Sequence, residues 1–339
     1  MKTVHMLGNG KVEILDLPEP EPYDNFVVVK IMSSTICGTE YTSYFGNVPL
    51  PSNSGHEAAG IVWNTDDARY VKKGDRVSIY PTMYYICHQC PACLSGDWLH
   101  CQNFKWPKPN QKYPGNHSQY VLVREDICLS IPDDISFEAG ALLDDCFGTP
   151  YQAIKRLQVN AFDTVLITGV GPIGAAAVML SKFLNANVIA VDINDMRLEH
   201  VSHYGVEHII NPTKEDVLKT VRKLTNKKGV DVALECSGIE EAQIQCLEAV
   251  KPRGRVAFLG IKSESTKINV LQHFILKDLT VIGSWAMIPN MHSELVELVR
   301  RGLPIEKIIT HRFKIEDAAS AFEAFFSGEA VKVSINPWD

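Results

Sequence analysis

The sequence predicts a two-domain α/β protein, in which a β-rich domain is combined with a domain built on a parallel sheet. The chain has 339 residues, which is more than one typical hydrophobic core accommodates. Its first 150 residues consist largely of short apolar runs between Pro, Gly and Asn clusters. From about residue 154, apolar strand-like runs alternate with helical segments, which is typical of βαβ units in a parallel sheet.

Individual elements follow from these runs. In the first part, strands are expected at FVVVKI (26–31), DRVSIY (75–80) and YVLVRE (120–125). In the second part, strands are expected at DTVLIT (163–168), NVIAVD (187–192), DVALEC (231–236), RVAFLGI (255–261) and LTVIGS (279–284), with a helix at AAAVMLSKFL. Beyond residue 290, two amphipathic helices, SELVELVRR and EDAASAFEAFFSG, precede a closing strand, AVKVSIN.

Composition gives no reason to expect two common classes of partner. Hydrophobic residues make up 45% and charged residues 22% of the chain, an ordinary balance for a globular protein. The net charge of -7 and the lack of a long basic run give no reason to expect nucleic acid or an anionic membrane. The first residues lack the apolar stretch of a signal peptide, and no segment is apolar enough to span a bilayer. We therefore expect a cytoplasmic protein.

Four of the nine cysteines fall within fifteen residues, in the spacing C-x2-C-x2-C-x7-C. Closely spaced cysteines in an intracellular protein more often bind metal than form disulfides, although a redox switch is an alternative. Four thiolates complete a closed tetrahedral zinc site, which has no position for a substrate. We therefore expect a structural zinc in a lobe at about residues 85–103, with these ligands: Cys87, Cys90, Cys93 and Cys101.

A dinucleotide site is predicted where GVGPIG follows an expected strand and opens a helix. The first two glycines permit a tight turn and close approach to a pyrophosphate, and the third lets helix and strand pack. The helix N-terminus adds backbone N–H groups and a favourable dipole. A purely structural βαβ turn is the alternative. The residues expected to bind the cofactor here are Gly169, Gly171, Pro172, Ile173 and Gly174.

Two further residues bear on which dinucleotide binds. Asp192 ends the next expected strand, where a carboxylate binds the adenosine ribose hydroxyls and repels the extra phosphate of NADP. NAD is therefore favoured over NADP. Arg197 lies close in the sequence and softens that repulsion.

A second metal site has isolated candidate ligands upstream. Cys37 lies in STICGTE, and His56 and Glu57 lie in SNSGHEAAG. A thiolate, an imidazole and carboxylates are the mixed ligands of an open catalytic zinc. A lone Cys, however, is usually a small buried hydrophobe, and the sequence pattern does not show that these residues converge.

The ordered series ICGTE, GHEAAG, GDRV, the four-cysteine lobe, GVGPIG, VDIND, ECSG and ITHRF resembles the zinc-dependent medium-chain dehydrogenases, nearest the sorbitol, threonine and cyclitol branch. The resemblance covers nearly the whole chain. It implies a GroES-like catalytic domain, residues 1–153 and 290–339, divided by a Rossmann domain with a doubly wound parallel sheet, residues 154–289.

The resemblance also implies which residues hold the catalytic zinc. Cys37 and His56 match the first two ligands, and Glu57 matches a carboxylate that binds the metal or exchanges with water. Counting back from the glycine turn, the third ligand falls on Asp145, with Asp144 and Cys146 as adjacent rivals.

Other residues match the family less closely. Thr39 matches the hydroxyl that relays the substrate proton. Glu40 stands where Asp is usual, as a partner expected to orient the histidine ligand. The usual histidine of the proton relay is absent after Glu40, so proton exit needs water or another group. His117 is unusual in GNHSQYV and is expected at the surface, or in reach of substrate. Trp285 and Met287 lie where relatives line the cleft or pack between domains.

The resemblance implies a function. Zinc polarises a secondary hydroxyl of a polyol, amino alcohol or (amino)cyclitol, and hydride passes to the nicotinamide of NAD. Two zinc ions per chain are expected, together with a homodimer or homotetramer, since LTVIGS forms an exposed sheet edge. The alternatives are a simple secondary-alcohol dehydrogenase, a relative without catalytic zinc that serves as reductase or binding protein, and a thiol redox sensor.

Overall fold

The computed structural model describes residues 1–50, 52–82, 85–105, 115–262 and 265–338. The chain divides into two compact units, Met1–Gly148 with Met287–Asp339, and Thr149–Ala286. Both divisions fall a few residues before the boundaries expected from the sequence. None of the helices in the described part of the chain is both long and apolar enough to cross a bilayer.

The first unit is built on a seven-stranded sheet whose centre is the long strand β3. β4 pairs with β3 along its length, and β6 pairs with its first half. β15, from near the C-terminus, pairs with its end, so that Ser334 lies opposite Thr35. This pairing explains why the C-terminal segment belongs to the first unit. The strands of this sheet are β3 (Phe26–Thr35), β4 (Glu57–Asn64), β5 (Arg76–Ile79), β6 (Tyr120–Arg124), β7 (Cys128–Ser130), β14 (His311–Lys314) and β15 (Val333–Asn336), and a separate two-stranded sheet consists of β1 (Lys2–Gly8) and β2 (Lys11–Asp16).

Helices of the first unit cover the sheet and close its ends. The C-terminal helix α10 packs its apolar face, including Phe322 and Phe325, on Val4, Met6 and Ile36. A π-helix, labelled η4 (Leu143–Phe147), directly follows α3. The helices are α1 (Tyr41–Phe45), α2 (Pro91–Leu94), α3 (Phe137–Leu142), η4, α9 (His292–Arg300) and α10 (Ala318–Ser327).

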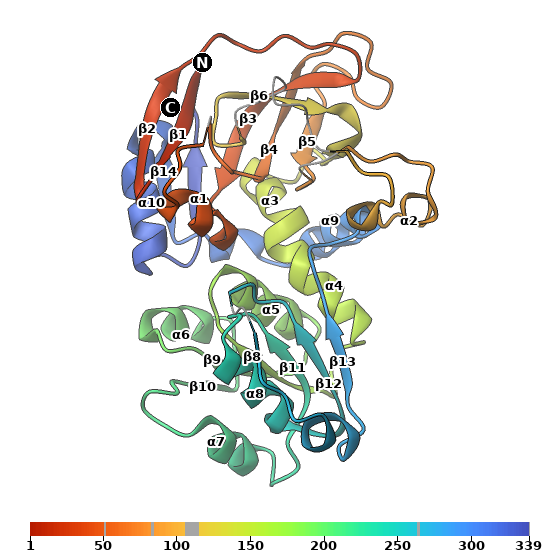
Figure 1. Cartoon of the computed structure of the whole chain (residues 1–339), viewed down its shortest axis with the longest axis vertical. Helices are drawn as coiled ribbons and strands as arrows, with labels where there is room; N and C mark the ends of the chain where they lie inside the picture. Colours follow the sequence, from red (N-terminus) through yellow and green to blue (C-terminus); the bar gives the residue numbers. More distant parts are fainter. Residues whose placement is uncertain (51, 83–84, 106–114, 263–264, 339) are drawn as a thin grey trace. The chain divides into compact units, whose positions relative to one another are not determined.

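The second unit is a six-stranded parallel sheet in the order β10-β9-β8-β11-β12-β13, flanked by helices (Figure 1). Strand order reverses between β8 and β11, as in a doubly wound dinucleotide-binding fold. The elements are α4 (Gly148–Arg156), β8 (Thr164–Thr168), α5 (Pro172–Phe183), β9 (Asn187–Val191), α6 (Asp195–Ser202), β10 (His208–Ile210), α7 (Val217–Leu224), β11 (Val230–Glu235), α8 (Glu240–Ala249), β12 (Val250–Phe258) and β13 (Thr280–Gly283).

The predicted fold class is confirmed, and the apolar runs named above correspond to β3, β5, β6, β8, α5, β9, β11, β12, β13, β15, α9 and α10. The pattern did not single out the β1–β2 hairpin, β4, the short strands β7, β10 and β14, or the π-helix η4. Short strands carry few residues of alternation, and a π-helix differs from an α-helix by only one residue in its hydrogen bonds.

Candidate active site

The four cysteines of the predicted zinc lobe converge on one point. Their Sγ atoms all lie within 4.8 Å of one another, and those of Cys87 and Cys93 are 3.9 Å apart. Thiolates about 2.3 Å from a tetrahedral zinc ion lie about 3.8 Å from each other, so this spacing fits zinc. All nine cysteines of the chain are free thiols, which excludes a disulfide framework.

The backbone of this lobe points N–H groups at the sulfurs. The N–H of Cys90 donates to the Sγ of Cys87 at 3.3 Å, and the N–H of Gln102 donates to the Sγ of Cys90 at 3.4 Å. Such bonds favour the charged form of a thiol. The backbone N–H of Gln89 lowers the pKa of the Cys87 thiol to about 6. These bonds favour the thiolates of Cys87 and Cys90, whereas burial raises the pKa of the Cys93 thiol to about 12.

The residues expected around the reactive zinc also meet. Cys37, His56, Glu57 and Asp145 each offer one ligand atom within 4.8 Å of the others. His56 Nε2 is 3.1 Å from Asp145 Oδ2, and Cys37 Sγ is 3.6 Å from the same oxygen. The antiparallel pairing of β3 and β4 places Thr35 opposite Glu57, which brings the segments carrying Cys37 and His56 together.

His56 presents an unprotonated ring nitrogen to this cluster when its ring is neutral. Its Nδ1 lies 2.9 Å from the carbonyl oxygen of Ser54, which only accepts, so Nδ1 carries the proton. Nε2 then faces the Asp145 carboxylate with a lone pair. Electron-rich atoms converge in this way at low cost only where a proton or a metal cation lies between them. The donor set fits zinc with one position left open.

The cluster attracts positive charge. Burial opposes protonation of His56, but the negative charges of Cys37 and Asp145 outweigh it and hold the His56 pKa well above its usual range. Burial, reinforced by Asp145, raises the pKa of the Cys37 thiol. A divalent cation at this point would reverse the effect on Cys37, since it favours the thiolate.

The π-helix η4 separates the two adjacent aspartates. Asp145 faces Cys37 and His56. Asp144, in contrast, accepts a hydrogen bond from the hydroxyl of Ser78 and lies 2.7 Å from His292 Nδ1. Cys146 is fully buried and outside the ligand group. Of the three candidates for the third ligand, Asp145 is the one that the fold brings to the cluster.

Lys332 is a site residue that the sequence pattern did not single out. Its Nζ donates to the carbonyl oxygen of Ile36 at 2.9 Å and forms an ion pair with Glu57 Oε2, both side chains being fully buried. The other carboxylate oxygen, Glu57 Oε1, is buried without a hydrogen-bond partner. Glu57 is thus anchored through one oxygen, and the second remains an acceptor. The available signal was a charge inside the apolar run AVKVSIN.

Two expectations about neighbouring residues are wrong. Glu40 does not orient His56, whose Nδ1 is bonded to Ser54; instead Glu40 accepts from the backbone N–H of Cys37 at 2.9 Å and pairs with His117. His117 is neither a surface nor a substrate-facing residue, because its side chain is fully buried. The longer side chain of Glu40, compared with the expected Asp, allows it to reach His117.

The remaining residues expected near the substrate differ in how exposed they are. Thr39 is exposed, and its Oγ1 lies 3.3 Å from Cys37 Sγ and 3.5 Å from His56 Nε2. Trp285 is half exposed, while Met287 is fully buried. Thr39 is accordingly the hydroxyl that solvent and ligands reach next to Cys37.

The glycine turn has the geometry of a dinucleotide loop. Gly169 has φ 77°, a left-handed conformation that favours glycine. A Cβ on Gly174 would lie 1.8 Å from the carbonyl oxygen of Gly169, so no side chain fits there. Gly171 caps α5, and Pro172 begins it, followed by Ile173. The turn and the N-terminus of α5 together form the backbone surface that binds pyrophosphate in such folds.

Asp192 is fixed beside this turn. Its carboxylate accepts from the backbone N–H of Val170 at 2.7 Å and from that of Asn194 at 2.9 Å. Arg197 lies near the turn, its Nη1 being 3.7 Å from where a Cβ on Gly171 would lie. The expected cofactor residues therefore gather at the ends of β8 and β9.

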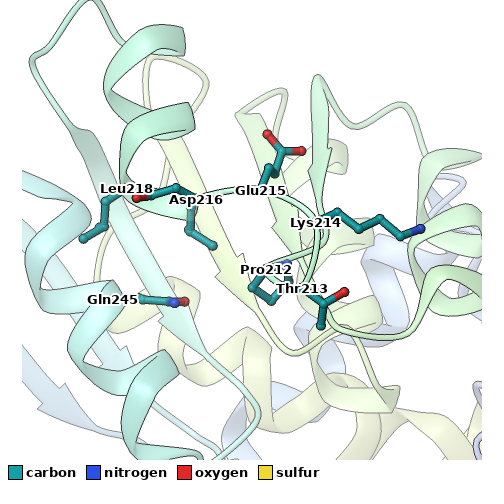
Figure 2. Close-up of a pocket in the computed structure, with 8 residues that line it drawn as sticks. Pro212, Thr213, Lys214, Glu215, Asp216, Leu218 and Gln245 are labelled. Carbon is teal, nitrogen blue, oxygen red and sulfur yellow. The ribbon is translucent and has the colours of Figure 1, made fainter.

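The second unit also carries a cavity of about 530 Å³, lined by residues 212–218 and Gln245, beside the start of α7 (Figure 2). None of the glycines of the turn, nor Asp192, lines it. Lys214, on its wall, pairs with Asp195 at 2.6 Å. This cavity is therefore separate from the residues predicted to bind the cofactor.

Known protein families match both units. The profile described as alcohol dehydrogenase GroES-like domain matches residues 23–133, and the profile described as zinc-binding dehydrogenase matches residues 172–301. Among solved structures, an alcohol dehydrogenase from Thermus sp. ATN1 superposes with a TM-score of 0.90 at 26% identity, covering 99% of each chain. Galactitol-1-phosphate dehydrogenase from Escherichia coli superposes with a TM-score of 0.86 at 25% identity, covering 99% of this chain and 100% of that one.

Relatives of similar length agree with these matches. The chain is 30% identical to a sorbitol dehydrogenase of Halalkalibacterium halodurans, covering 100% of this chain and 99% of that protein. It is 32% identical to an L-threonine 3-dehydrogenase of Chromobacterium violaceum, covering 96% of each. The fold and the likeness along the whole chain lead to one conclusion: the chain belongs to the zinc-dependent medium-chain dehydrogenases and is an oxidoreductase that acts on CH–OH groups.

Proposed function

We propose that this protein is a zinc-dependent, NAD-linked dehydrogenase that oxidises a secondary hydroxyl of a polyol, amino alcohol or (amino)cyclitol to a ketone. The observation that carries the proposal is the convergence of Cys37, His56 and Asp145, with Glu57 beside them. One thiolate, one imidazole and one carboxylate leave the fourth zinc position open, as a catalytic site requires.

Two zinc ions per chain follow from the two clusters. The four-cysteine lobe fills every position of a tetrahedral ion and is therefore structural. The second ion would be held by Cys37, His56 and Asp145, and Glu57 Oε1 is a further carboxylate oxygen that the site offers. Lys332 neutralises Glu57, so two anionic ligands and a dication sum to zero charge. An unpaired third carboxylate would oppose ionisation of the substrate hydroxyl.

When bound, zinc favours ionisation of a substrate hydroxyl, and NAD takes up the hydride. This chain's own residues supply the rest. Thr39 Oγ1, exposed and 3.3 Å from Cys37 Sγ, accepts the released proton while passing on its own. Proton exit beyond Thr39 uses water, because the three residues directly after Glu40, namely Tyr41, Thr42 and Ser43, include no histidine.

NAD is the proposed cofactor rather than NADP. Asp192 holds a negative charge where the adenosine ribose lies in such folds, and two backbone N–H groups keep its carboxylate in place. The extra phosphate of NADP would meet this carboxylate, and Arg197 offsets the repulsion only in part.

The relatives named sorbitol dehydrogenase and L-threonine 3-dehydrogenase support a polar, hydroxyl-rich or amino-substituted substrate. A simple secondary alcohol is the second candidate, favoured by aspartate as the third ligand and by the likeness to the Thermus alcohol dehydrogenase. A relative without catalytic zinc is disfavoured, since such a protein does not need these four side chains to converge.

A second copy of the chain is the proposed macromolecular partner. β13 is the last strand in the order of the parallel sheet, so one of its edges is open to pairing. Exposed apolar side chains, among them Leu271, Ile275 and Leu276, lie shortly before it in the chain. A homodimer formed by edge pairing, or a tetramer of such dimers, would cover them.

The test is NADH formation by the zinc-loaded protein across polyols, threonine, aminocyclitols and simple secondary alcohols, with a Cys37→Ser variant as control. Activity on the polar members, absent from the control, supports the proposal. Activity confined to simple secondary alcohols would favour the second candidate. Silence across the panel, with NAD binding intact, would contradict both.

A further inference from the structure

A buried hydrogen-bonded pair, a carboxylate and an imidazole, lies beside the catalytic cluster. Glu40 and His117 have no solvent-exposed side-chain surface, and His117 Nε2 is 3.0 Å from Glu40 Oε2. Nε2 donates, because a carboxylate only accepts. The other ring nitrogen, Nδ1, lies 2.9 Å from the hydroxyl of Ser34, which either donates or accepts. Every polar atom of the His117 ring therefore has a partner.

This pair reaches the first metal ligand through its backbone. Glu40 Oε1 accepts from the N–H of Cys37 at 2.9 Å, and Glu40 is itself part of the 3-10 turn that begins directly after Cys37. A buried carboxylate that is bonded both to the Cys37 N–H and to His117 thus fixes the turn that carries Cys37 and Thr39.

The same histidine limits the position of the second ligand. A Cβ on Gly55 would lie 2.6 Å from His117 Cδ2, so the ring packs directly on the residue before His56. Asn53 ties the two segments together, because its Oδ1 accepts from the backbone N–H of both Gly55 and His117, at 3.1 and 3.2 Å. The ring is therefore packed against the loop of His56 and hydrogen-bonded to it through Asn53.

We propose that His117 is a positioning residue of the catalytic zinc site, which acts on Cys37 through the Glu40 carboxylate and on His56 through Gly55. The proposal rests on the proposed zinc site. It goes beyond that site because neither Glu40 nor His117 contacts the donor atoms of the expected metal ligands. Partners behind ligands typically change metal affinity by about 10- to 100-fold when removed.

The experiment measures the release of zinc to a competing chelator in three variants. His117→Phe keeps a ring of similar size and leaves the Glu40 carboxylate buried beside an apolar group. We expect one of the two zinc ions to leave about 10- to 100-fold faster than in the wild type, while the other stays. In Glu40→Gln/His117→Phe the stranded charge is gone, and Gln accepts from the Cys37 N–H, so zinc retention recovers toward wild type.

Glu40→Asp covers the case in which His117→Phe does not fold. It keeps the charge but shortens the side chain by one methylene, so that it loses reach to Cys37 N–H or to His117. The same faster loss of one zinc ion is expected. Unchanged release in Glu40→Asp and in a folded His117→Phe would overturn the proposal. If the double variant released zinc as fast as His117→Phe alone, the proposed action of His117 through the Glu40 carboxylate would be overturned.

A purely structural role has a different signature. Asp163→Asn is the matched control, because Asp163 is a buried aspartate paired with Arg255 in the second unit. It should lower the unfolding temperature while both zinc ions stay. In cobalt-substituted protein, His117→Phe should shift the visible bands of the open site, and the control should not. Failure of the proposed function is distinguishable, since the wild type itself would then hold only one zinc ion.

Discussion

At the scale of single residues, the Cys37 thiolate has the most direct effect on the proposed chemistry. Cys37→Ser keeps the size of the side chain but replaces the thiolate ligand. Several kcal/mol of charge stabilisation would be lost, so kcat/KM should fall by at least about 1,000-fold. Initial rates and a dinucleotide titration check this. NAD binding should stay intact; its loss as well would point to unfolding instead of a lost ligand.

A second prediction for single residues concerns the contribution of the Lys332–Glu57 ion pair to stability. Lys332→Met leaves a buried carboxylate without its cation, and such losses cost about 3–5 kcal/mol of the free energy of unfolding. Urea unfolding followed by tryptophan fluorescence measures the cost. The double variant Lys332→Met/Glu57→Gln should recover most of it. A single variant as stable as the wild type would show that the pair is not needed.

The roles of some of these residues could be predicted from the sequence, and the roles of others could not. Cys37, His56 and Glu57 stand in short motifs, so resemblance pointed to them directly. Lys332 lies 275 positions from Glu57, and only the pairing of β15 with β3 brings it there. Glu40 was misread because its partner, His117, comes from a distant segment that the motif does not include.

At the scale of elements, the π-helix η4 gives Asp144 and Asp145 different roles. Asp144→Ala breaks a buried pair with His292 and should cost about 3–5 kcal/mol of stability. Asp145→Ala should cost much less stability but lose one zinc ion. Thermal unfolding and metal analysis of both variants check this. Loss of zinc in Asp144→Ala alone, with Asp145→Ala retaining both ions, would reverse the assignment of the two aspartates.

Element types were predictable wherever apolar runs were long. β8 and β9 follow from such runs, and the glycine turn between β8 and α5 follows from its motif. The π-helix does not, because one extra residue in a helical turn leaves the apolar pattern of ALLDDCFG unchanged. That extra residue affects which aspartate faces Cys37. Counting back from the glycine turn therefore did not distinguish Asp145 from its neighbours Asp144 and Cys146 as the third ligand.

At the scale of the whole molecule, the proposed preference for NAD rests on the second unit. Asp192→Ala removes the fixed carboxylate beside the glycine turn, while Arg197 remains near it. We expect kcat/KM for NAD to fall and that for NADP to rise, each by about tenfold, which corresponds to about 1.4 kcal/mol. Kinetics with both dinucleotides measure the change. Equal losses with both would mean that Asp192 supports the fold of the turn and does not select the cofactor.

The two-unit organisation was predictable from the change of pattern near residue 154 and the return of the chain near residue 290. The sheet order of each unit was not, because strand neighbours depend on long-range pairing that apolar runs do not encode. The C-terminal strand β15 illustrates this, since its parallel partner β14 and its antiparallel partner β3 lie on opposite sides of it.

The zinc content of the purified, fully metal-loaded wild-type chain tests the central claim most directly. Two zinc ions per chain are predicted, one of which is lost from Cys37→Ser while the other stays with the four-cysteine lobe. One zinc ion per chain in the wild type, unchanged in Cys37→Ser, would contradict the catalytic site, and with it the dehydrogenase mechanism proposed for this protein.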